Sequence, residues 1–429
     1  MEWESILIII FTGIVAFMGV TYVSYYRYLL AIVKSSRARE RQTNLASAEH
    51  PRISIIVCTF NEESTVEGKL LDLLSQDYPV DQMEVIVMDS GSSDKTPSVV
   101  ESFAETHKTL NLRLLRERER RGKTAALNIA IHEVNSNSEI VVITDCDSRF
   151  AKNSLKHAVE SFADPRVGLV MGVQTLINPN ESIATKVEST YRRFYVLVRQ
   201  GESLIDSTPI CNGELVACRR QVIQRVPLRD NVNTDDVQLA ILTRRTGLRS
   251  ICNPDAGFYE FAPPISRDLR RQKIRRGQGI VRTLWANRDL VFNKEFGEYG
   301  MLIFPMNFFM HIVSPVISVA AIILAIGILG VIMIEGAVWI PIVIAAVGAL
   351  TLLAWPKLAR MYRTLMSFTY YQLMLSYAIF LALMGRSLHK WQKIESVRDK
   401  QRWARIDSPL QMREREVPAA AQCTSKMPD

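Results

Sequence analysis

Hydrophobic residues fall into three blocks along the chain, and the first block is a single continuous apolar run. The run SILIIIFTGIVAFMGVTYVSYY begins directly after the first four residues. About 20 apolar residues are enough to cross a bilayer. Because the residues before the run are partly acidic and no small-residue cleavage site follows it, we expect an uncleaved transmembrane helix at residues 1–33.

The second block alternates short apolar runs with segments of helical period between residues 51 and 147. ISIIVCTF, MEVIVMD, LRLLRE and EIVVITD are predicted strands, whereas TVEGKLLDLLSQ, PSVVESFAETH and GKTAALNIAIHEV are predicted helices. Strands that alternate with helices of this size form a parallel sheet covered on both faces. The pattern therefore predicts an α/β domain with a mainly parallel sheet.

The rest of this domain is less regular, and we place its full extent at residues 50–290. VGLVMGVQTLI is a predicted strand, and CNGELVACRRQVI is a strand or a turn that leads into a helix. Helical spacing is present in ATKVESTYRRFYVLVRQGES, NTDDVQLAILTRRTG and RDLRRQKIRRGQGIVRTLW. No internal repeat is present.

The third block consists of long apolar runs at residues 314–334, 338–355 and 365–384. A shorter run at 301–312 is expected to lie in the membrane interface. We assign residues 299–385 to a C-terminal bundle of about three spans and 386–429 to a basic cytoplasmic tail. The basic link at 357–363 and this tail both favour the cytoplasm, yet only one apolar run separates them. Either that run does not cross the membrane or a shorter run elsewhere does.

Charge gives the orientation and the expected partners. Lys34, Arg37, Arg39 and Arg41 follow the first apolar run, so the positive-inside rule puts the middle domain in the cytoplasm of a multi-pass plasma-membrane protein. The 52 Lys and Arg exceed the 44 Asp and Glu, but the basic residues cluster beside apolar runs. Anionic lipid is therefore the expected partner, and nucleic acid is not. The six cysteines show no metal-type pairs and are expected to be reduced and structural.

Polar residues gather where the predicted strands end, at positions 59–62, 89–94 and 145–147. In parallel sheets, ligands bind beyond the carboxyl ends of the strands. Turn chemistry explains each cluster singly, whereas the three together indicate a binding site. A pair such as Asp145 and Asp147 holds a divalent cation when phosphate oxygens complete the coordination shell. By itself, however, such a short motif is a weak signal.

Six motifs in order carry a resemblance to a known family: CTFNEE, VIVMDSGSSDKT, RGKTAALNIA, ITDCDS, NTDDVQLAI and RRQKIRRGQG. Together with the flanking apolar runs, they resemble the family-2 inverting glycosyltransferases. The chain looks most like the membrane-integrated branch that includes cellulose, chitin, hyaluronan and poly-N-acetylglucosamine synthases. The resemblance covers residues 53–284 and implies a nucleotide-sugar-binding domain of the GT-A type, with a donor expected to be UDP-linked.

The resemblance also implies which residues bind the donor. Thr59, Asn61 and Glu62 would border the nucleotide base and Asp89 would contact the uridine, while Lys123 would lie near the diphosphate. Asp145 and Asp147 would hold Mg²⁺ or Mn²⁺, and Asp145 would also contact the donor. The motifs CTFNEE, VIVMDSGSSDKT, RGKTAALNIA and ITDCDS carry these assignments.

The implied catalytic residues are Asp236, Asp235, Arg275 and Gln272. Inverting transfer needs a carboxylate that takes a proton from the acceptor hydroxyl and a positive group that stabilises the departing diphosphate. Asp236 matches the general base and Asp235 the acid before it, whereas Arg275 and Lys123 match the cations. If the motif stood alone, an acidic first turn of an ordinary helix would be the preferred explanation of TDDVQL.

The sequence departs from the family on the acceptor side. Gln272 and Arg275 match the family pattern Gln-x-x-Arg-Trp, but Arg276 stands where the Trp is expected. An aromatic ring stacks under the acceptor sugar, and a guanidinium replaces it only in part. Gly213, in CNGELVACRR, matches the loop that lines the acceptor site. KWQKIESVR, after the last apolar run, resembles the basic Trp-containing tail of some members.

Three functions remain open. The first is transfer from a nucleotide sugar to a growing saccharide, which the C-terminal apolar runs favour because they suit a polymer channel. The second is a single transfer to a polyprenyl phosphate or another lipid, which the missing Trp favours. The third is a non-catalytic membrane scaffold, against which the retention of all the acids argues.

Overall fold

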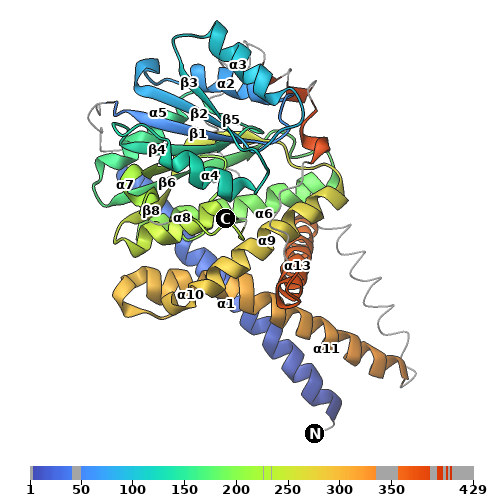
Figure 1. The fold of residues 1–429 in the computed structure, drawn as a ribbon. Coiled ribbons are helices and arrows are strands. Elements are labelled where there is room, and N and C mark those ends of the chain that lie inside the picture. The colour runs from blue at the N-terminus through green and yellow to red at the C-terminus, as the bar shows by residue number, and fades with distance from the viewer. Residues whose placement is uncertain are drawn as a thin grey trace.

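The computed structural model describes residues 3–40, 50–225, 227–232, 234–334, 356–386, 394–399, 402–403 and 406–407. The described residues form one eight-stranded sheet in the order β3-β2-β1-β4-β7-β6-β8-β5. Helices cover the sheet, and long helices extend from one side of it (Figure 1). The strands are β1 Ile53–Thr59, β2 Met83–Asp89, β3 Asn111–Arg116, β4 Ile140–Asp145, β5 Ser148–Phe150, β6 Val167–Leu176, β7 Val216–Arg219 and β8 Arg249–Glu260.

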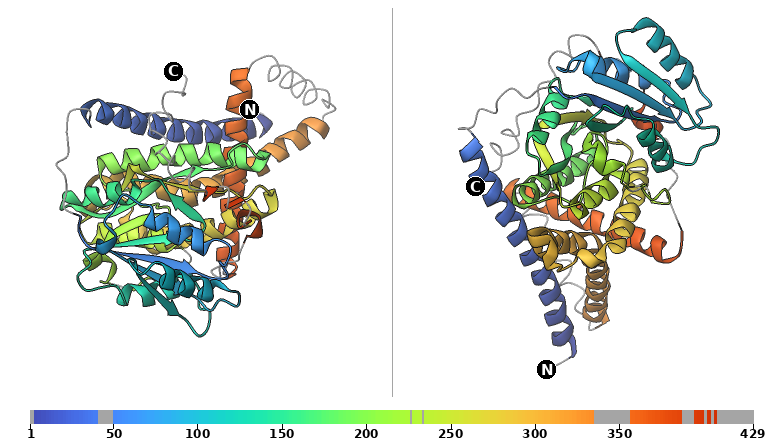
Figure 2. Two further views of the ribbon diagram at one scale, coloured as in Figure 1. Left: turned by 90° about the horizontal axis from the view of Figure 1, so that it is seen from above. Right: turned by 60° about the vertical axis from the view of Figure 1, so that its left-hand side comes forward.

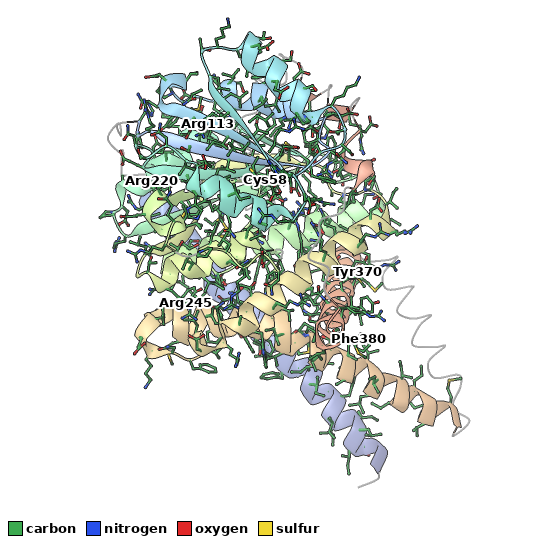
Figure 3. All side chains as sticks on the ribbon, viewed as in Figure 1. Cys58, Arg113, Arg220, Arg245, Tyr370 and Phe380 are labelled. Carbon is green, nitrogen blue, oxygen red and sulfur yellow. The ribbon has the colours of Figure 1, made fainter. Side chains whose placement is uncertain are left out.

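The first half of the domain is the predicted parallel α/β unit. Strands β1 to β4 pair in parallel and are connected by α2 (Val66–Leu74), α3 (Thr96–Thr106) and α4 (Lys123–His132). The chain order reverses between β1 and β4, and at that point Cys58 is in register with Asp145. In open α/β sheets such a reversal opens a crevice beyond the strand ends. Cys58, which marks this end of β1, lies near the middle of the molecule (Figure 3).

Alternation along the strands builds a core on each face of the sheet. Ile53, Ile55 and Val57 of β1 belong to one apolar cluster with α2 and α3, whereas Ile56 belongs to another with α4. These side chains are fully buried, and each contributes about 1.5–3 kcal/mol to folding. The sheet is therefore buried on both faces, as the continuous apolar strands predicted.

The second half contains a strand that the sequence pattern did not predict. Strand β8 pairs in parallel with β6 although Pro254 lies within it. The register slips between the pairs Met171–Cys252 and Val173–Gly257, so the residues from 253 to 256 bulge out of the ladder. A proline is tolerated at such a bulge because it has no N–H to donate to a neighbouring strand. The stretch NPDAG interrupts the alternation of apolar and polar residues, so the sequence pattern did not predict this strand.

The remaining helices join the sheet to the apolar part of the chain. In Figure 1, α6 and α9 lie between the sheet and the helices α1, α11 and α13, and Figure 2 shows α1 crossing the same side of the molecule. The helices of this region and of the domain's second half are α1 Trp3–Glu40, α5 Ser154–Glu160, α6 Ile183–Ile205, α7 Arg220–Ile223, α8 Asp235–Arg245, α9 Ser266–Ala286, α10 Phe304–Phe308, α11 Ser314–Ile334 and α13 Pro356–Leu383.

Three described helical segments are long and apolar enough to cross a membrane: Ser5–Ser36, Tyr299–Met333 and Thr364–Leu383. The run at 301–312, expected as a separate interfacial segment, is instead continuous with α11 through two π-helical turns. Apolar side chains such as Phe380, which is half exposed, project from these helices (Figure 3). The predicted run at 338–355 lies outside the described residues.

The C-terminal segment, defined as the described residues between Ile394 and Asp407, returns to the domain that contains the sheet. Trp403 is 1% exposed and packs its ring edge-on against Phe261 at the end of β8. Asp407 accepts two hydrogen bonds from Arg149, at 2.8 and 2.9 Å. Figure 1 shows this segment as red pieces beside the sheet. These residues of the predicted tail are thus part of the folded domain.

Candidate active site

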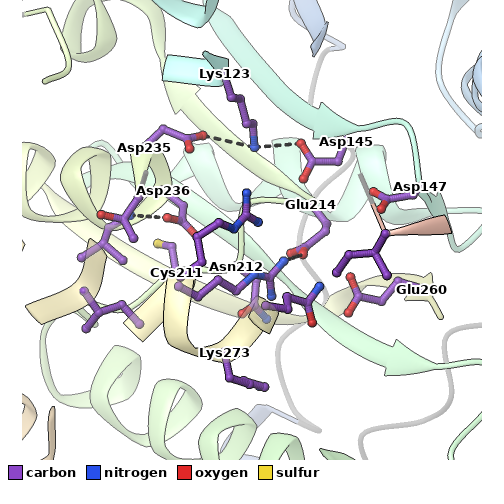
Figure 4. A pocket seen from close by; sticks show the side chains of 18 of the residues that line it. Lys123, Asp145, Asp147, Cys211, Asn212, Glu214, Asp235, Asp236, Glu260 and Lys273 are labelled. Atoms are coloured by element: carbon purple, nitrogen blue, oxygen red, sulfur yellow. Dashed lines mark hydrogen bonds and ion pairs between the residues drawn. The ribbon is translucent and has the colours of Figure 1, made fainter. Parts of the chain in front are cut away.

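A cavity opens at the carboxyl edge of the sheet and brings most of the predicted site residues together. Its lining continues past the strand ends to α6, α9 and α13. Figure 4 shows acidic and basic side chains pointing into this cavity from several elements. The predicted residues that line it are Thr59, Glu62, Lys123, Asp145, Asp147, Gly213, Asp235, Asp236, Gln272, Arg275 and Arg276.

Lys123 joins two of the acid motifs. It begins α4, and its ammonium lies 2.7 Å from Asp145 and 3.3 Å from Asp235 (Figure 4). Burial opposes the charge of Lys123, but these two carboxylates outweigh burial and raise its pKa above the ordinary value. The ammonium is therefore a fixed positive charge between the end of β4 and the start of α8.

Asp236 lies at the first turn of α8, next to Asp235. Burial is the largest cause, and the neighbouring Asp235 carboxylate the second, of the rise in the pKa of Asp236 to about 7. A general base works best when its pKa is near the working pH. A Cβ at Gly213 would stand 3.5 Å from the Asp236 carboxylate, so the loop that contains this glycine passes beside the acid.

Glu62 and Asp147 share one cation that comes from the C-terminal segment. The guanidinium of Arg398 lies 2.7 Å from Glu62 and 2.9 Å from Asp147. Burial raises the pKa of Glu62 to about 7, against the opposing charge of Arg398. Arg398 was not singled out from the sequence, although it belongs to KWQKIESVR, which resembles the tail of some family members.

Asp145 and Asp147 present two carboxylates to the cavity, each with a side chain 26% exposed. Among the described residues, no group of three His, Cys, Asp or Glu side chains is arranged to hold a metal ion. A hexacoordinate cation would therefore need oxygens from a ligand or from water, and Mg²⁺ is commonly bound in this way with phosphate oxygens. The two acids fit a cation that arrives with a diphosphate.

Helix α9 contributes Gln272, Arg275 and Arg276 to the cavity. Arg276 lies 2.6 Å from Glu214, which is 1% exposed. Burial opposes the ionisation of Glu214, but Arg276 outweighs it and lowers the pKa of Glu214 to about 2. Burial and the nearby Arg276 lower the pKa of Arg275 to about 10, so it keeps its charge at neutral pH. At the position where the family pattern has an aromatic ring, this chain therefore has an arginine that is paired with a buried acid.

A second network of charged side chains, which sequence reasoning missed, contributes to the lining of the same cavity. Glu188 of α6 pairs with Lys273 of α9 at 2.7 Å and accepts a hydrogen bond from Tyr371 of α13. Arg192, one turn further along α6, bridges Glu188 and Glu260 of β8. The network fixes α6, α9 and α13 against the sheet. Its residues come from four separate elements of the chain, so no local sequence motif predicts the network.

Two predicted donor-binding residues, Asn61 and Asp89, do not line the cavity. Asn61 has a positive φ of 55° and accepts a hydrogen bond from the backbone N–H of Ser93 at 2.8 Å. Asp89 is fully buried at the end of β2 and accepts from the backbone N–H of Ser92. In this structure both residues hold the loop after β2. Their direct contact with a donor stays a prediction.

Comparison with known proteins places this geometry in a family. The family described as Glycosyl transferase family 2 matches residues 54–226. The mannosyltransferase PcManGT of Pyrobaculum calidifontis, solved in complex with GDP-Man and Mn²⁺, is 31% identical and superimposes with a TM-score of 0.68. That match covers 90% of this chain and 99% of the other. The chain belongs to glycosyltransferase family 2. Its domain has the GT-A-like α/β fold that the sequence predicted.

Two other relatives have more distant sequences. The beta-monoglucosyldiacylglycerol synthase of Trichormus variabilis is 24% identical over 312 residues, which are 72% of this chain and 64% of that protein. The poly-beta-1,6-N-acetyl-D-glucosamine synthase of Staphylococcus epidermidis is 25% identical over 254 residues, or 56% of this chain and 59% of that protein. The matches thus span less than two thirds of the length of these relatives.

Proposed function

We propose that this family-2 protein transfers a sugar, with inversion, from a nucleotide sugar to a hydroxyl group of a membrane-associated acceptor. One observation carries the proposal. Lys123 lies between Asp145 and Asp235, and Asp236 stands beside them in the same cavity. A charge-fixed cation next to a carboxylate with a pKa of about 7 is the pair that an in-line displacement at an anomeric carbon requires.

Each charged residue of the cavity has a separate role in the proposed transfer. The acceptor hydroxyl attacks the anomeric carbon while its proton passes to the carboxylate of Asp236. The bond from that carbon to the diphosphate oxygen breaks, and the electron pair leaves with the nucleoside diphosphate. Lys123 and Arg275, both in the cavity lining, face the negative charge that develops on the leaving group. Asp235 holds the ammonium of Lys123 in place.

Asp145 and Asp147 would hold a divalent cation, Mg²⁺ or Mn²⁺, together with the donor. Such a cation neutralises charge on the departing diphosphate. The Mn²⁺ in the Pyrobaculum calidifontis enzyme supports this proposal. In the described arrangement Lys123 and Arg398 balance the same two carboxylates, so cation binding has to displace or share these contacts.

The rim of the cavity supplies a place for the nucleotide base. Arg120 lies over the ring of Phe60 at 3.7 Å, and both residues line the cavity beside Thr59. A flat ring and a flat guanidinium both stack on a base. The family resemblance favours a UDP-sugar, whereas the enzyme of Pyrobaculum calidifontis was solved with GDP-Man. The test of donor use therefore includes both series.

The ion pair of Arg276 with the buried Glu214 favours a single transfer over processive polymerisation. A stacking platform supports successive sugars of a growing chain through their flat faces. In this chain Arg276 occupies that position of α9, and it forms an ion pair with Glu214 at 2.6 Å. Processive synthesis of a polysaccharide remains the competing proposal, and product length separates the two.

The proposed setting is a cell membrane, with the catalytic domain on the cytoplasmic side. Support comes from the three candidate spans and from the basic residues that follow the first of them. Candidate span Thr364–Leu383 contributes Tyr371 and Leu375 to the cavity lining. An acceptor from the bilayer would thus meet the catalytic residues directly.

A turnover assay tests the proposal. Purified protein in lipid nanodiscs is given a panel of UDP- and GDP-sugars with Mg²⁺ or Mn²⁺ and total membrane lipid. We expect one donor to be consumed and its sugar to appear on extractable lipid as a single addition. A ladder of long saccharide would establish polymerisation instead. No consumption of any donor by the folded protein would refute the proposed function.

A further inference from the structure

The wall of the cavity includes side chains from two candidate membrane spans. His311 belongs to the span Tyr299–Met333, and Tyr371 belongs to the span Thr364–Leu383. The same cavity is lined by Asp236, the proposed base. An acceptor that enters from the bilayer and reacts at this base would therefore pass His311.

One of the two ring nitrogens of His311 is used inside the protein, and the other is not. The residue is 1% exposed and lies in the π-helical turn Phe309–Val313, and such turns are frequent at functional sites. Its Nδ1 lies 2.9 Å from the carbonyl oxygen of Asn307. Because a carbonyl can only accept, Nδ1 carries the hydrogen, and in a neutral ring Nε2 is then an acceptor. No described residue forms a hydrogen bond with Nε2, and no described carboxylate pairs with the ring.

Neighbouring residues hold the His311 ring in place. The side-chain amide of Asn307, which supplies the carbonyl partner of the ring, donates to Glu202 of α6 at 2.7 Å. Tyr195 of α6 packs against the imidazole, with 5.6 Å between the ring centroids and an interplanar angle of 47°. A binding group that is already held by packing and by hydrogen bonds loses little freedom when a ligand arrives.

A series of contacts along the cavity wall joins His311 to the proposed base. The neighbouring Tyr195 ring lies 5.9 Å from the guanidinium of Arg199, which donates to the carbonyl of Ile210 at 2.9 Å. Ile210 begins the loop that contains Gly213, and a Cβ there would stand 3.5 Å from the carboxylate of the base. All of these residues line the cavity. A ligand whose hydroxyl lies at the base therefore has a continuous surface along which to extend to His311.

Resting on the proposed function, we propose that Nε2 of His311 accepts a hydrogen bond from a hydroxyl or N–H group of the acceptor while another hydroxyl of the acceptor reacts at Asp236. His311 orients the acceptor and takes up no proton during the transfer. The acceptor therefore carries at least two hydrogen-bond donors. In the competing structural explanation, the ring serves only to satisfy the carbonyl of Asn307 through Nδ1.

Two substitutions of His311 separate the roles of its nitrogens. In His311→Asn the side-chain amide lies where Nδ1 was and still donates to the carbonyl of Asn307. In His311→Gln the amide reaches the position of Nε2 and its oxygen still accepts a hydrogen bond. His132→Asn, at the exposed end of α4, controls for the loss of an imidazole. Turnover is measured with the full protein in phosphatidylcholine nanodiscs that contain increasing total membrane lipid, and then with increasing donor.

We expect His311→Asn to raise the amount of membrane lipid that gives half-maximal rate by about three- to tenfold, the effect of one neutral hydrogen bond. The half-saturating donor concentration should not change, and His311→Gln and His132→Asn should resemble wild type. A larger loss in His311→Gln than in His311→Asn, no loss in either variant, or an equal rise for the donor would overturn the proposal. No turnover by the folded wild type would refute the proposed function itself.

Chemical modification tests the same nitrogen without a substitution, and so covers the case in which a variant does not fold. Diethyl pyrocarbonate acylates accessible, unprotonated imidazole nitrogens, and mass spectrometry of peptides reports each histidine separately. We expect His311 of wild type to react in nanodiscs of phosphatidylcholine and to lose this reactivity when total membrane lipid is included. His132 should react equally in both lipids, and UDP or GDP alone should not protect His311. An unreactive His311, or one that reacts equally in both lipids, would overturn the proposal.

Discussion

The guanidinium of Arg398 lies 2.9 Å from the carboxylate of Asp147, although 251 residues separate them in the chain. The same guanidinium is bound to Glu62, which follows β1. The C-terminal segment therefore closes one side of the proposed donor site and neutralises two acids there. Trp403 and Asp407 fix the segment to the sheet by contacts with Phe261 and Arg149.

Removing Arg398 should destabilise the catalytic domain. Its side chain and that of Glu62 are each 3% exposed, and a buried pair that loses one partner costs about 3–5 kcal/mol. Arg398→Met should lower the thermal midpoint, and adding Glu62→Gln should restore part of the loss. A double-mutant cycle by thermal unfolding in nanodiscs measures the coupling. Additive effects of the two changes would contradict the buried pair.

Replacing the proposed base should abolish turnover and spare donor binding. Asp236→Asn keeps the size of the side chain but cannot take a proton, so we expect kcat to fall about 10²–10⁴-fold. Nucleotide affinity, measured by calorimetry, should be unchanged. Asp255→Asn, an exposed acid in the β8 bulge, is the matched control. Full activity of Asp236→Asn would favour the non-catalytic scaffold.

The pH dependence of kcat should report Asp236. Burial and Asp235 raise its pKa to about 7, so the carboxylate is protonated and inactive below that pH. We expect kcat to rise about tenfold per pH unit up to about pH 7 and then to level off. Asp235→Asn removes a like charge and should move the midpoint to lower pH. A midpoint that moves upward in this variant would contradict the assigned cause.

Restoring the family's aromatic residue should not by itself restore a stacking platform. Arg276→Trp leaves the carboxylate of Glu214, which is 1% exposed, without its cation, and an unpaired buried charge is destabilising. We expect this variant to have a lower thermal midpoint. The double variant Arg276→Trp/Glu214→Gln should recover stability, and its product length tests whether the ring supports repeated transfer. A fully stable single variant would show that the ion pair contributes little.

Metal removal should stop turnover if Asp145 and Asp147 hold the cation. Activity lost in chelator should return with Mg²⁺ or Mn²⁺. Asp147→Asn leaves one carboxylate, so we expect at least about tenfold more cation to be needed for half-maximal rate. Asp94→Asn, in the loop after β2, is the control because Asp94 is absent from the cavity lining. Undiminished activity in chelator would remove the metal from the mechanism.

The sequence determined the parallel half of the sheet and the edge at which the site lies. Apolar runs of strand length alternate with helical segments there, and this information is local in the chain. Because parallel strands end at one edge, Asp145 and the end of β1 had to lie close together, as the register of Cys58 with Asp145 shows. The six motifs also gave the family, and the comparisons confirm it.

Tertiary structure alone decided the contacts between distant segments. Strand β8 forms although Pro254 breaks its pattern, because pairing with β6 on either side tolerates a bulge. Lys123 reaches Asp235, and Arg398 reaches Asp147, through packing that no local period encodes. No local motif in the sequence marks charged side chains such as Arg192 of α6. Only the folded chain places them in a cavity, because burial and pairing depend on which other segments lie against them.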